Sequence, residues 1–262
     1  MDLESSLCEY RNGRFCMSDS IDVEEAFTIV EYLPVCDVGL LDFPNVRELE
    51  PRPALILSTA GAIFEFTGLE TLPLESAYAL ARYRGEYLSF PKLTALDEEL
   101  ASAFGGFKCD LLLRGVESLS AAEARGLANH SGKIALSGLQ FLSAEAAKHL
   151  ARHRGSLLQL GMKAMDDEVA EAIAEYPGEL HLLNLEHVSA KAAAAFVKRQ
   201  PLPAEDHGLP RSFGEVMQRI DRRQAGRVAF GNLKSAPPEA IAALRNCPMV
   251  TICKPSKKTQ AE

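Results

Sequence analysis

The sequence predicts an α/β solenoid in which parallel strands line one face and helices line the other, with a cap at each end. Three observations support this fold class. A pattern recurs every 23 or 24 residues, the apolar spacing changes from two to a helical period inside each repeat, and Gly or Asn recurs between the two parts. Because so short a unit cannot bury its own apolar side chains, neighbouring units are expected to stack.

The repeat is clearest in the middle of the chain. The segment that begins at Leu111 (LLLRGVESLSAAEARGLANHSG) aligns with the segment that begins at Ile134 (IALSGLQFLSAEAAKHLARHRG). One apolar position keeps register through nine units, at Val46, Leu69, Leu93, Val116, Leu139, Met162, Leu185, Leu209 and Leu233. Leu209 lies in a segment rich in Pro and charge, and we interpret residues 203–226 as a degenerate repeat.

Each unit opens with a short alternation of apolar and other residues, which is typical of a strand with one buried face. The predicted strands are 41–43, 64–66, 88–90, 111–113, 134–136, 158–160, 180–182, 228–230 and 250–252. The middle residues of successive units should form one exposed row, which is the candidate partner-binding site: Asp42, Glu65, Ser89, Leu112, Ala135, Gln159, His181, Glu205, Ala229 and Thr251.

The residue between strand and helix is Gly or Asn in eight of nine units, Lys92 being the exception. Gly and Asn tolerate a positive φ, so this turn is expected to be left-handed. The nine residues are Asn45, Gly68, Lys92, Gly115, Gly138, Gly161, Asn184, Gly208 and Asn232.

Ala-rich segments follow the turns and are predicted to be helices. Ser120, Ser143 and Asp166 stand directly before such segments, and acidic residues follow, as the N-terminus of a helix favours. Gly residues stand at the C-terminal ends of the predicted helices, where they predict left-handed C-caps. They are Gly85, Gly132, Gly155 and Gly178.

The pattern Leu-x-Leu-x-Gly-Leu-x-x-Leu-Ser-x-Glu-Ala-Ala resembles the leucine-rich repeat family, over about residues 41–252. The resemblance implies a curved solenoid that binds a protein. One departure is that Asn45, Asn184 and Asn232 stand directly before the apolar residue, whereas the commonest family pattern places Asn two residues before it. The internal asparagine ladder of the family is therefore not expected.

The chain is expected to divide into an acidic N-terminal cap (1–40), a solenoid of about nine turns (41–252) and a basic tail (253–262). The first fifty residues carry 12 Asp and Glu against three Arg, while the whole chain has a net charge of -8. Residues 21–32 predict an amphipathic capping helix with Phe27 and Val30 turned inward.

Two histidines raise the question of a metal site. His149 and His153 lie one helical turn apart, a spacing that can present two imidazoles to one ion. His153 also belongs to a row at the helix ends, with members 23 or 24 residues apart, where a partial positive charge is favourable. The row is Tyr83, Phe107, His130, His153, Tyr176 and Arg199. We therefore predict a stacking row and no metal ion.

Other candidates for chemistry are weaker. His181 is expected to be an exposed strand residue. The six cysteines form no Cys-x-x-Cys pair, so they are expected to be reduced and mostly buried. No phosphate loop, nucleophile elbow, His-Glu-x-x-His or calcium loop occurs. We expect no catalytic residues and no cofactor.

These observations favour a cytoplasmic, monomeric protein that binds another protein through its strand face. The polar start and the lack of a long apolar run disfavour a membrane protein, and the negative net charge disfavours a nucleic-acid partner. Asp42 and Glu65 favour a basic partner. The alternative is a structural spacer, or a fragment of a larger repeat array, with no binding site of its own. A third interpretation places function in an amphipathic helix at 213–224, although its apolar residues are better explained as core.

Overall fold

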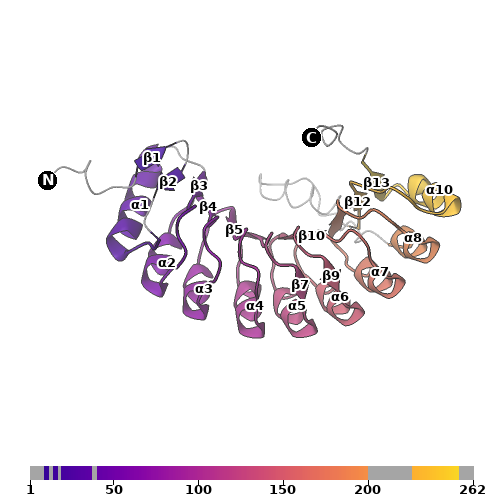
Figure 1. The fold of residues 1–262 in the computed structure, drawn as a ribbon, viewed down its shortest axis with the longest axis horizontal. Helices are drawn as coiled ribbons and strands as arrows, with labels where there is room; N and C mark the ends of the chain where they lie inside the picture. Colours follow the sequence, from indigo (N-terminus) through magenta and orange to yellow (C-terminus); the bar gives the residue numbers. More distant parts are fainter. Residues whose placement is uncertain (1–8, 12–13, 17–18, 37–39, 200–225, 254–262) are drawn as a thin grey trace, which may run out of the picture.

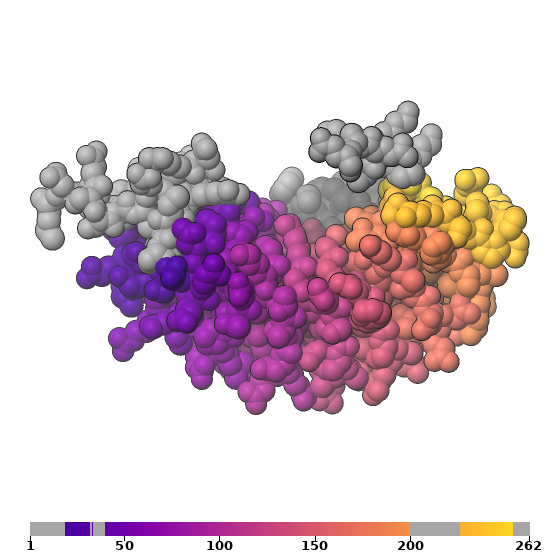
Figure 2. Space-filling model, viewed as in Figure 1, coloured from indigo at the N-terminus to yellow at the C-terminus, as the bar shows by residue number. Residues whose placement is uncertain are grey.

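The computed structural model describes residues 9–11, 14–16, 19–36, 40–199 and 226–253. Strands alternate with helices along the chain, and the units form an arc with the strands on its inner side and the helices on its outer side (Figure 1). Side chains fill the space between successive ribbons, so the units form one continuous curved body (Figure 2). The predicted α/β class with parallel strands is confirmed.

The main sheet has 11 strands in the order β1-β2-β3-β4-β5-β6-β8-β10-β11-β12-β13. They are β1 (Glu9–Arg11), β2 (Arg14–Cys16), β3 (Leu40–Asp42), β4 (Ile63–Glu65), β5 (Tyr87–Ser89), β6 (Asp110–Leu112), β8 (Ile134–Leu136), β10 (Leu157–Leu160), β11 (Glu179–Leu182), β12 (Val228–Phe230) and β13 (Val250–Ile252). All pairs are parallel except β1 with β2. Each predicted strand is found within one residue.

The helices pack side by side along the outer side of the arc (Figure 1). They are α1 (Val23–Cys36), α2 (Pro51–Leu57), α3 (Leu74–Leu80), α4 (Glu98–Gly105), α5 (Ala121–Leu127), α6 (Ala144–Leu150), α7 (Asp167–Ala174), α8 (Ala190–Val197) and α10 (Pro238–Asn246). The predicted N-caps are confirmed at Ser120, which forms a capping box with Glu123, and at Ser143. Asp166 precedes α7, but its side chain makes no capping hydrogen bond.

The core is a set of rows that run through the units. Ala54, Ala77 and their equivalents in the next helices are fully buried, which lets the helices approach closely. Phe66 stacks on Phe43 and on Phe90, with ring centroids 5.1 Å and 5.5 Å apart. Equivalent positions therefore contact one another across neighbouring units, and no unit has a core of its own.

The N-terminal cap differs from the prediction in two ways. It contains a β-hairpin, β1 with β2, that joins the sheet at Arg14 opposite Asp42. The predicted capping helix is α1, but Phe27 points outward and is 59% exposed, while Ala26 and Ile29 are buried. These two residues occupy the helix positions that Ala54 and Leu57 occupy in α2. The inward side of α1 is thus set by the helix packed against it.

The expected degenerate repeat at 203–226 lies almost wholly outside the described residues, as do Leu209, Gly208 and the helix predicted at 213–224. Strand β11 pairs directly with β12, with His181 opposite Ala229. β11 and β12 are therefore direct neighbours in the sheet. The basic tail beyond residue 253 is also outside the described part of the chain.

The left-handed turn predicted between strand and helix is wrong. Among the glycines of the described residues, only Gly226 has a positive φ, at 80°. The turn glycines are required because the backbones of adjacent units approach closely. A Cβ on Gly68 would lie 2.5 Å from the Pro44 carbonyl oxygen, and a Cβ on Gly115 would lie 2.7 Å from that of Pro91.

Substitution of a turn glycine should therefore be costly without any change in φ. We expect Gly68→Ala to lower the free energy of unfolding by about 1–3 kcal/mol, because the added carbon must push two units apart. Gly61→Ala is the matched control, since a Cβ there meets no atom within 4 Å. It should change stability by less than about 0.5 kcal/mol. Urea unfolding measures both, and equal effects would contradict the close-approach explanation.

Candidate functional site

The predicted strand row exists as a row. Residues paired across the sheet include Asp42 with Glu65, Ser89 with Leu112, Gln159 with His181 and Ala229 with Thr251. Glu205 lies outside the described residues. Glu65, Leu112, Ala135, Gln159, His181 and Ala229 are half-buried, and Thr251 is exposed.

The row is predicted to be exposed, but among its nine described members only Thr251 is exposed, and two are buried. Ser89 is fully buried, and its hydroxyl oxygen has no hydrogen-bond partner among the described residues. Asp42 is 5% exposed, and it accepts a hydrogen bond from the Thr67 hydroxyl. The acidic end of the row therefore has one half-buried carboxylate, Glu65, instead of two free ones.

Other polar side chains on the strand face bind their neighbours. The Tyr87 hydroxyl lies 3.4 Å from Glu65 Oε1, and burial together with the Glu65 carboxylate raises the pKa of Tyr87. Gln159 Nε2 donates to Ser137 Oγ at 3.0 Å. His181, expected to be an exposed residue, is instead half-buried, with Nε2 2.9 Å from Glu179 Oε1. The face is thus ordered by contacts within the protein.

Lys133 and Asp110 form a further pair on this face. The Lys133 backbone N–H donates to Asp110 Oδ1 at 2.8 Å, and its ammonium lies 3.5 Å from Oδ2. These two residues join adjacent units, as Gln159 and Ser137 do. Exposed ion pairs of this kind contribute little to stability, but they fix where side chains point.

The predicted stacking of the helix-end row is confirmed at His130, His153 and Tyr176. The rings of His130 and His153 are stacked with centroids 5.9 Å apart, and His153 and Tyr176 are 5.7 Å apart. All of the members are buried: Tyr83, Phe107, His130, His153, Tyr176 and Arg199. His149 is only half-buried, and His153 belongs to the core stack. Within the described part of the chain, no group of three or more His, Cys, Asp or Glu is placed to hold a metal ion.

Burial makes the row unfavourable for a charged histidine, contrary to the expectation from the helix dipole. Burial and the neighbouring His130 lower the pKa of His153 to about 4. Burial also lowers the pKa of His130, whose Nδ1 lies 3.1 Å from the Phe104 carbonyl oxygen. Neither ring nitrogen of His153 has a partner among the described residues. Both histidines are therefore neutral at pH 7.

The helix-end glycines are not left-handed C-caps. The helices end several residues earlier, at Leu80, Leu127, Leu150 and Ala174, with right-handed C-cap residues. These glycines instead leave room for a carbonyl oxygen of the preceding unit and for the polar group of the ring two residues before them. A Cβ on Gly155 would lie 2.5 Å from His153 Nε2, and one on Gly132 would lie 2.9 Å from His130 Nε2. Where the ring is Phe107, which has no polar group, the equivalent residue is Cys109.

Cys109, Cys247 and Cys253 are free thiols, and they differ in exposure. Cys109 is buried, and burial raises the pKa of its thiol to about 12. Cys247 is half-buried, but Cys253 is exposed, which contradicts the expectation of burial for this residue.

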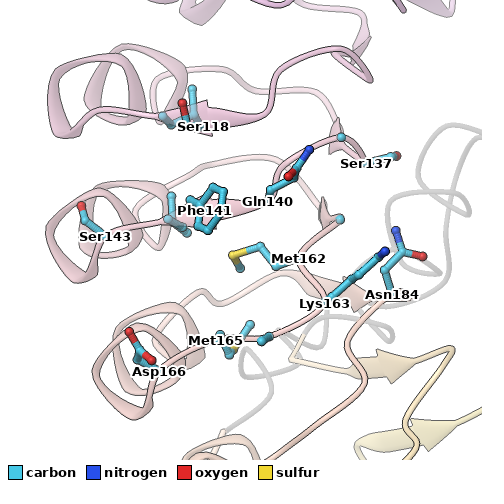
Figure 3. A pocket seen from close by; sticks show the side chains of 15 residues that line it. Ser118, Ser137, Gln140, Phe141, Ser143, Met162, Lys163, Met165, Asp166 and Asn184 are labelled. Carbon is cyan, nitrogen blue, oxygen red and sulfur yellow. The ribbon is translucent and has the colours of Figure 1, made fainter.

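A hollow of about 850 Å³, which the sequence interpretation missed, lies where the strands turn into the helices. It is lined by residues of four successive units, between Ser137 and Asn184 on the strand side and Ser143 and Asp166 on the helix side (Figure 3). Phe141 lies on its rim and is 73% exposed. The signal available in the sequence is an aromatic residue at a repeat position that is otherwise small or polar.

A scan against protein-family models gives no match for this chain, and no curated protein matches it. None of the described helices is long and apolar enough to span a membrane.

The buried histidines predict an acid-sensitive fold. Because the pKa of His153 is about 4 when folded and 6.5 ordinarily, the unfolded chain binds the additional proton as pH falls. The contribution of neutral His153 to the free energy of unfolding is fully present above about pH 6.5 and is lost toward about pH 4. Between about pH 7.5 and about pH 5, the free energy of unfolding should fall by about 2 kcal/mol through His153 alone.

Urea unfolding at the two pH values measures this effect. His153→Phe should remove most of the pH dependence, since Phe107 shows that a phenyl ring fits the row. His149→Ala should retain it. The explanation is wrong if the His153→Phe protein keeps the slope of the wild type.

Proposed function

We propose that this chain is a non-catalytic binding module, a leucine-rich-repeat-like solenoid that presents its strand face to a protein partner. The 23- and 24-residue repeat and the arc of strand–helix units support the solenoid (Figure 1). The observation that carries the function is the strand row, in which half-buried side chains from successive units lie directly beside one another.

The fixed side-chain positions on the strand face favour binding. Gln159, His181 and Glu65 are each held by a contact with a neighbouring side chain. Side chains that are fixed before binding lose less conformational freedom when a partner arrives. A shallow surface can then be specific, because its polar groups already point in defined directions.

The composition of the face favours a partner with both apolar and polar contacts. Leu112 and Ala135 lie side by side in the middle of the row, with Glu65 toward one end and Gln159 and His181 toward the other. An apolar centre with a polar rim is the usual arrangement of a protein interface. Because Asp42 is buried, Glu65 is the half-exposed carboxylate that remains for a basic contact among the described members of the row.

Affinity capture from a lysate of source cells tests the proposal. The Glu65→Lys, Gln159→Ala, His181→Ala triple variant should lose a partner that the wild type captures, because it changes three side chains of one face. A matched control changes three exposed helix-side residues: Glu75→Lys, Lys148→Ala and Arg152→Ala. It should retain the partner.

Both variants must show the melting temperature of the wild type. Capture that is indifferent to the strand face would contradict the proposal, and capture of nothing would favour a structural spacer.

A further inference from the structure

Phe141 is an exposed aromatic residue at a position where the repeat uses small or polar residues. The equivalent residues in the other units are Glu48, Thr71, Ala95, Ser118, Ala164, His187 and Ser235. The structure supports this alignment, since Ser118 pairs with Phe141 in the small sheet of β7 (Ser118–Leu119) and β9 (Phe141–Leu142), and His187 bridges Ser235. The fold therefore does not require an aromatic side chain here.

Apolar side chains continue from Phe141 into the hollow. Met162 forms its floor and is 2% exposed, while Leu142 and Met165 are half-buried. At the position of Leu142 and Met165, four other units bury the side chain, at Leu49, Leu72, Leu119 and Val188, while Leu96 and Ala236 are half-buried. Figure 3 shows Phe141, Met162 and Met165 grouped between the strand side and the helix side of the hollow. We call this site the Phe141 groove, lined by Gln140, Phe141, Met162, Lys163, Met165 and Asp166.

The groove lies where a contact between neighbouring turns is missing. On one side, the Gln140 N–H donates to the Glu117 carbonyl oxygen at 2.7 Å. On the other side, the Glu186 N–H donates to the Lys163 carbonyl oxygen at 2.9 Å. Between Gln140 and Lys163, both within the described residues, no such bond forms. The equivalent bond is also absent between Arg47 and Glu70, between Glu70 and Thr94, and between Thr94 and Glu117, all of them described residues. What distinguishes the junction of Gln140 and Lys163 is that apolar side chains line the open space there.

The surroundings of the groove are acidic. Glu145 in the first turn of α6, and Asp166 and Glu168 around the first turn of α7, are exposed. Among the lining residues, all of which are described, Lys163 is the only cation and Asp166 the only anion, so the excess negative charge comes from Glu145 and Glu168 beside them. Glu186 nearby is paired with Lys234 at 2.9 Å. This charge distribution repels acidic ligands and attracts basic ones.

We propose that the Phe141 groove binds a short peptide segment of a partner, carrying one aromatic or long aliphatic side chain flanked by Lys or Arg. The apolar side chain lies between Phe141 and Met165, above Met162, and the basic residues face the carboxylates of Glu145 and Glu168. A volume of about 850 Å³ is of the size that proteins use for small ligands and peptide side chains. This proposal rests on the proposed binding function and assigns a second contact surface, away from the strand face.

A synthetic array of short peptides tests the proposal with the full-length chain. The central residue is Phe, Leu or Ala, and the flanking residues are Lys, Glu or Ser. The wild type should bind Lys-flanked Phe and Leu peptides at least tenfold more tightly than Glu-flanked or Ala-centred ones, at physiological salt. Fluorescence polarisation gives the dissociation constants.

Variants then locate the site. Phe141→Ser, which installs the residue found at Ser118, should weaken binding of the Lys-flanked Phe peptide at least tenfold. Glu145→Lys with Glu168→Lys should remove the preference for Lys over Glu flanks. Tyr78→Ser is the matched control, because Tyr78 is 56% exposed on the outer helix α3. It should bind as the wild type does.

The proposal is overturned if no peptide binds, if Ala-centred Lys peptides bind as well as Phe-centred ones, or if Phe141→Ser binds normally. These failures are distinct from failure of the proposed function. A partner lost only by the strand-face variant, with no peptide bound, would support the strand face and reject the groove. Peptide binding that the strand-face variant retains would place the groove's contact apart from that face.

Discussion

The close approach of backbones in adjacent units is the constraint on which the structure depends. Parallel strands fix the spacing of units, since strand neighbours lie about 4.8 Å apart. At the turn glycines, a carbonyl oxygen of one unit occupies the place that a Cβ would take in the next, as at Pro44 and Gly68. The same conflict recurs where the chain enters a strand, at Gly85 and the Ala62 carbonyl. Glycine on both sides of the strand, and alanine in the helices, allow the ladder to continue unbroken.

The helix-end row shows how the same closeness is used for hydrogen bonding. The Tyr176 hydroxyl donates to the Gly155 carbonyl oxygen at 2.7 Å. Arg199 donates to four carbonyl oxygens and has its pKa lowered to about 10 by burial. His153 leaves both of its ring nitrogens without a partner among the described residues. The members of the row therefore occupy equivalent positions but differ in hydrogen bonding. His153, which lies between His130 and Tyr176, leaves its polar atoms without a partner in the described part of the chain.

The sequence predicts strands and register well, because a period of two followed by Gly or Asn gives both. It does not separate the two physical uses of glycine, freedom in φ and lack of a Cβ, so the left-handed turns were a wrong inference from a correct pattern. The burial of Ser89 and Asp42 and the outward position of Phe27 also depend on neighbours that a single unit does not reveal. For the groove, the alignment of repeats marks Phe141 as unusual. The hollow beside it, where no backbone hydrogen bond joins Gln140 to Lys163, is visible only in the structure.

In an array of nearly identical units, residues that maintain stacking must resemble their equivalents, so binding specificity has to come from residues that differ. Many differences are still structural, and Cys109, which is buried at a position where four other units have glycine, is one. A difference indicates function when it is exposed and no neighbouring unit accounts for it. The strand row meets this condition only in part, since several of its polar groups already bind within the protein. Phe141 meets it more fully, because an exposed aromatic ring beside an open apolar hollow gains burial only when something else binds there.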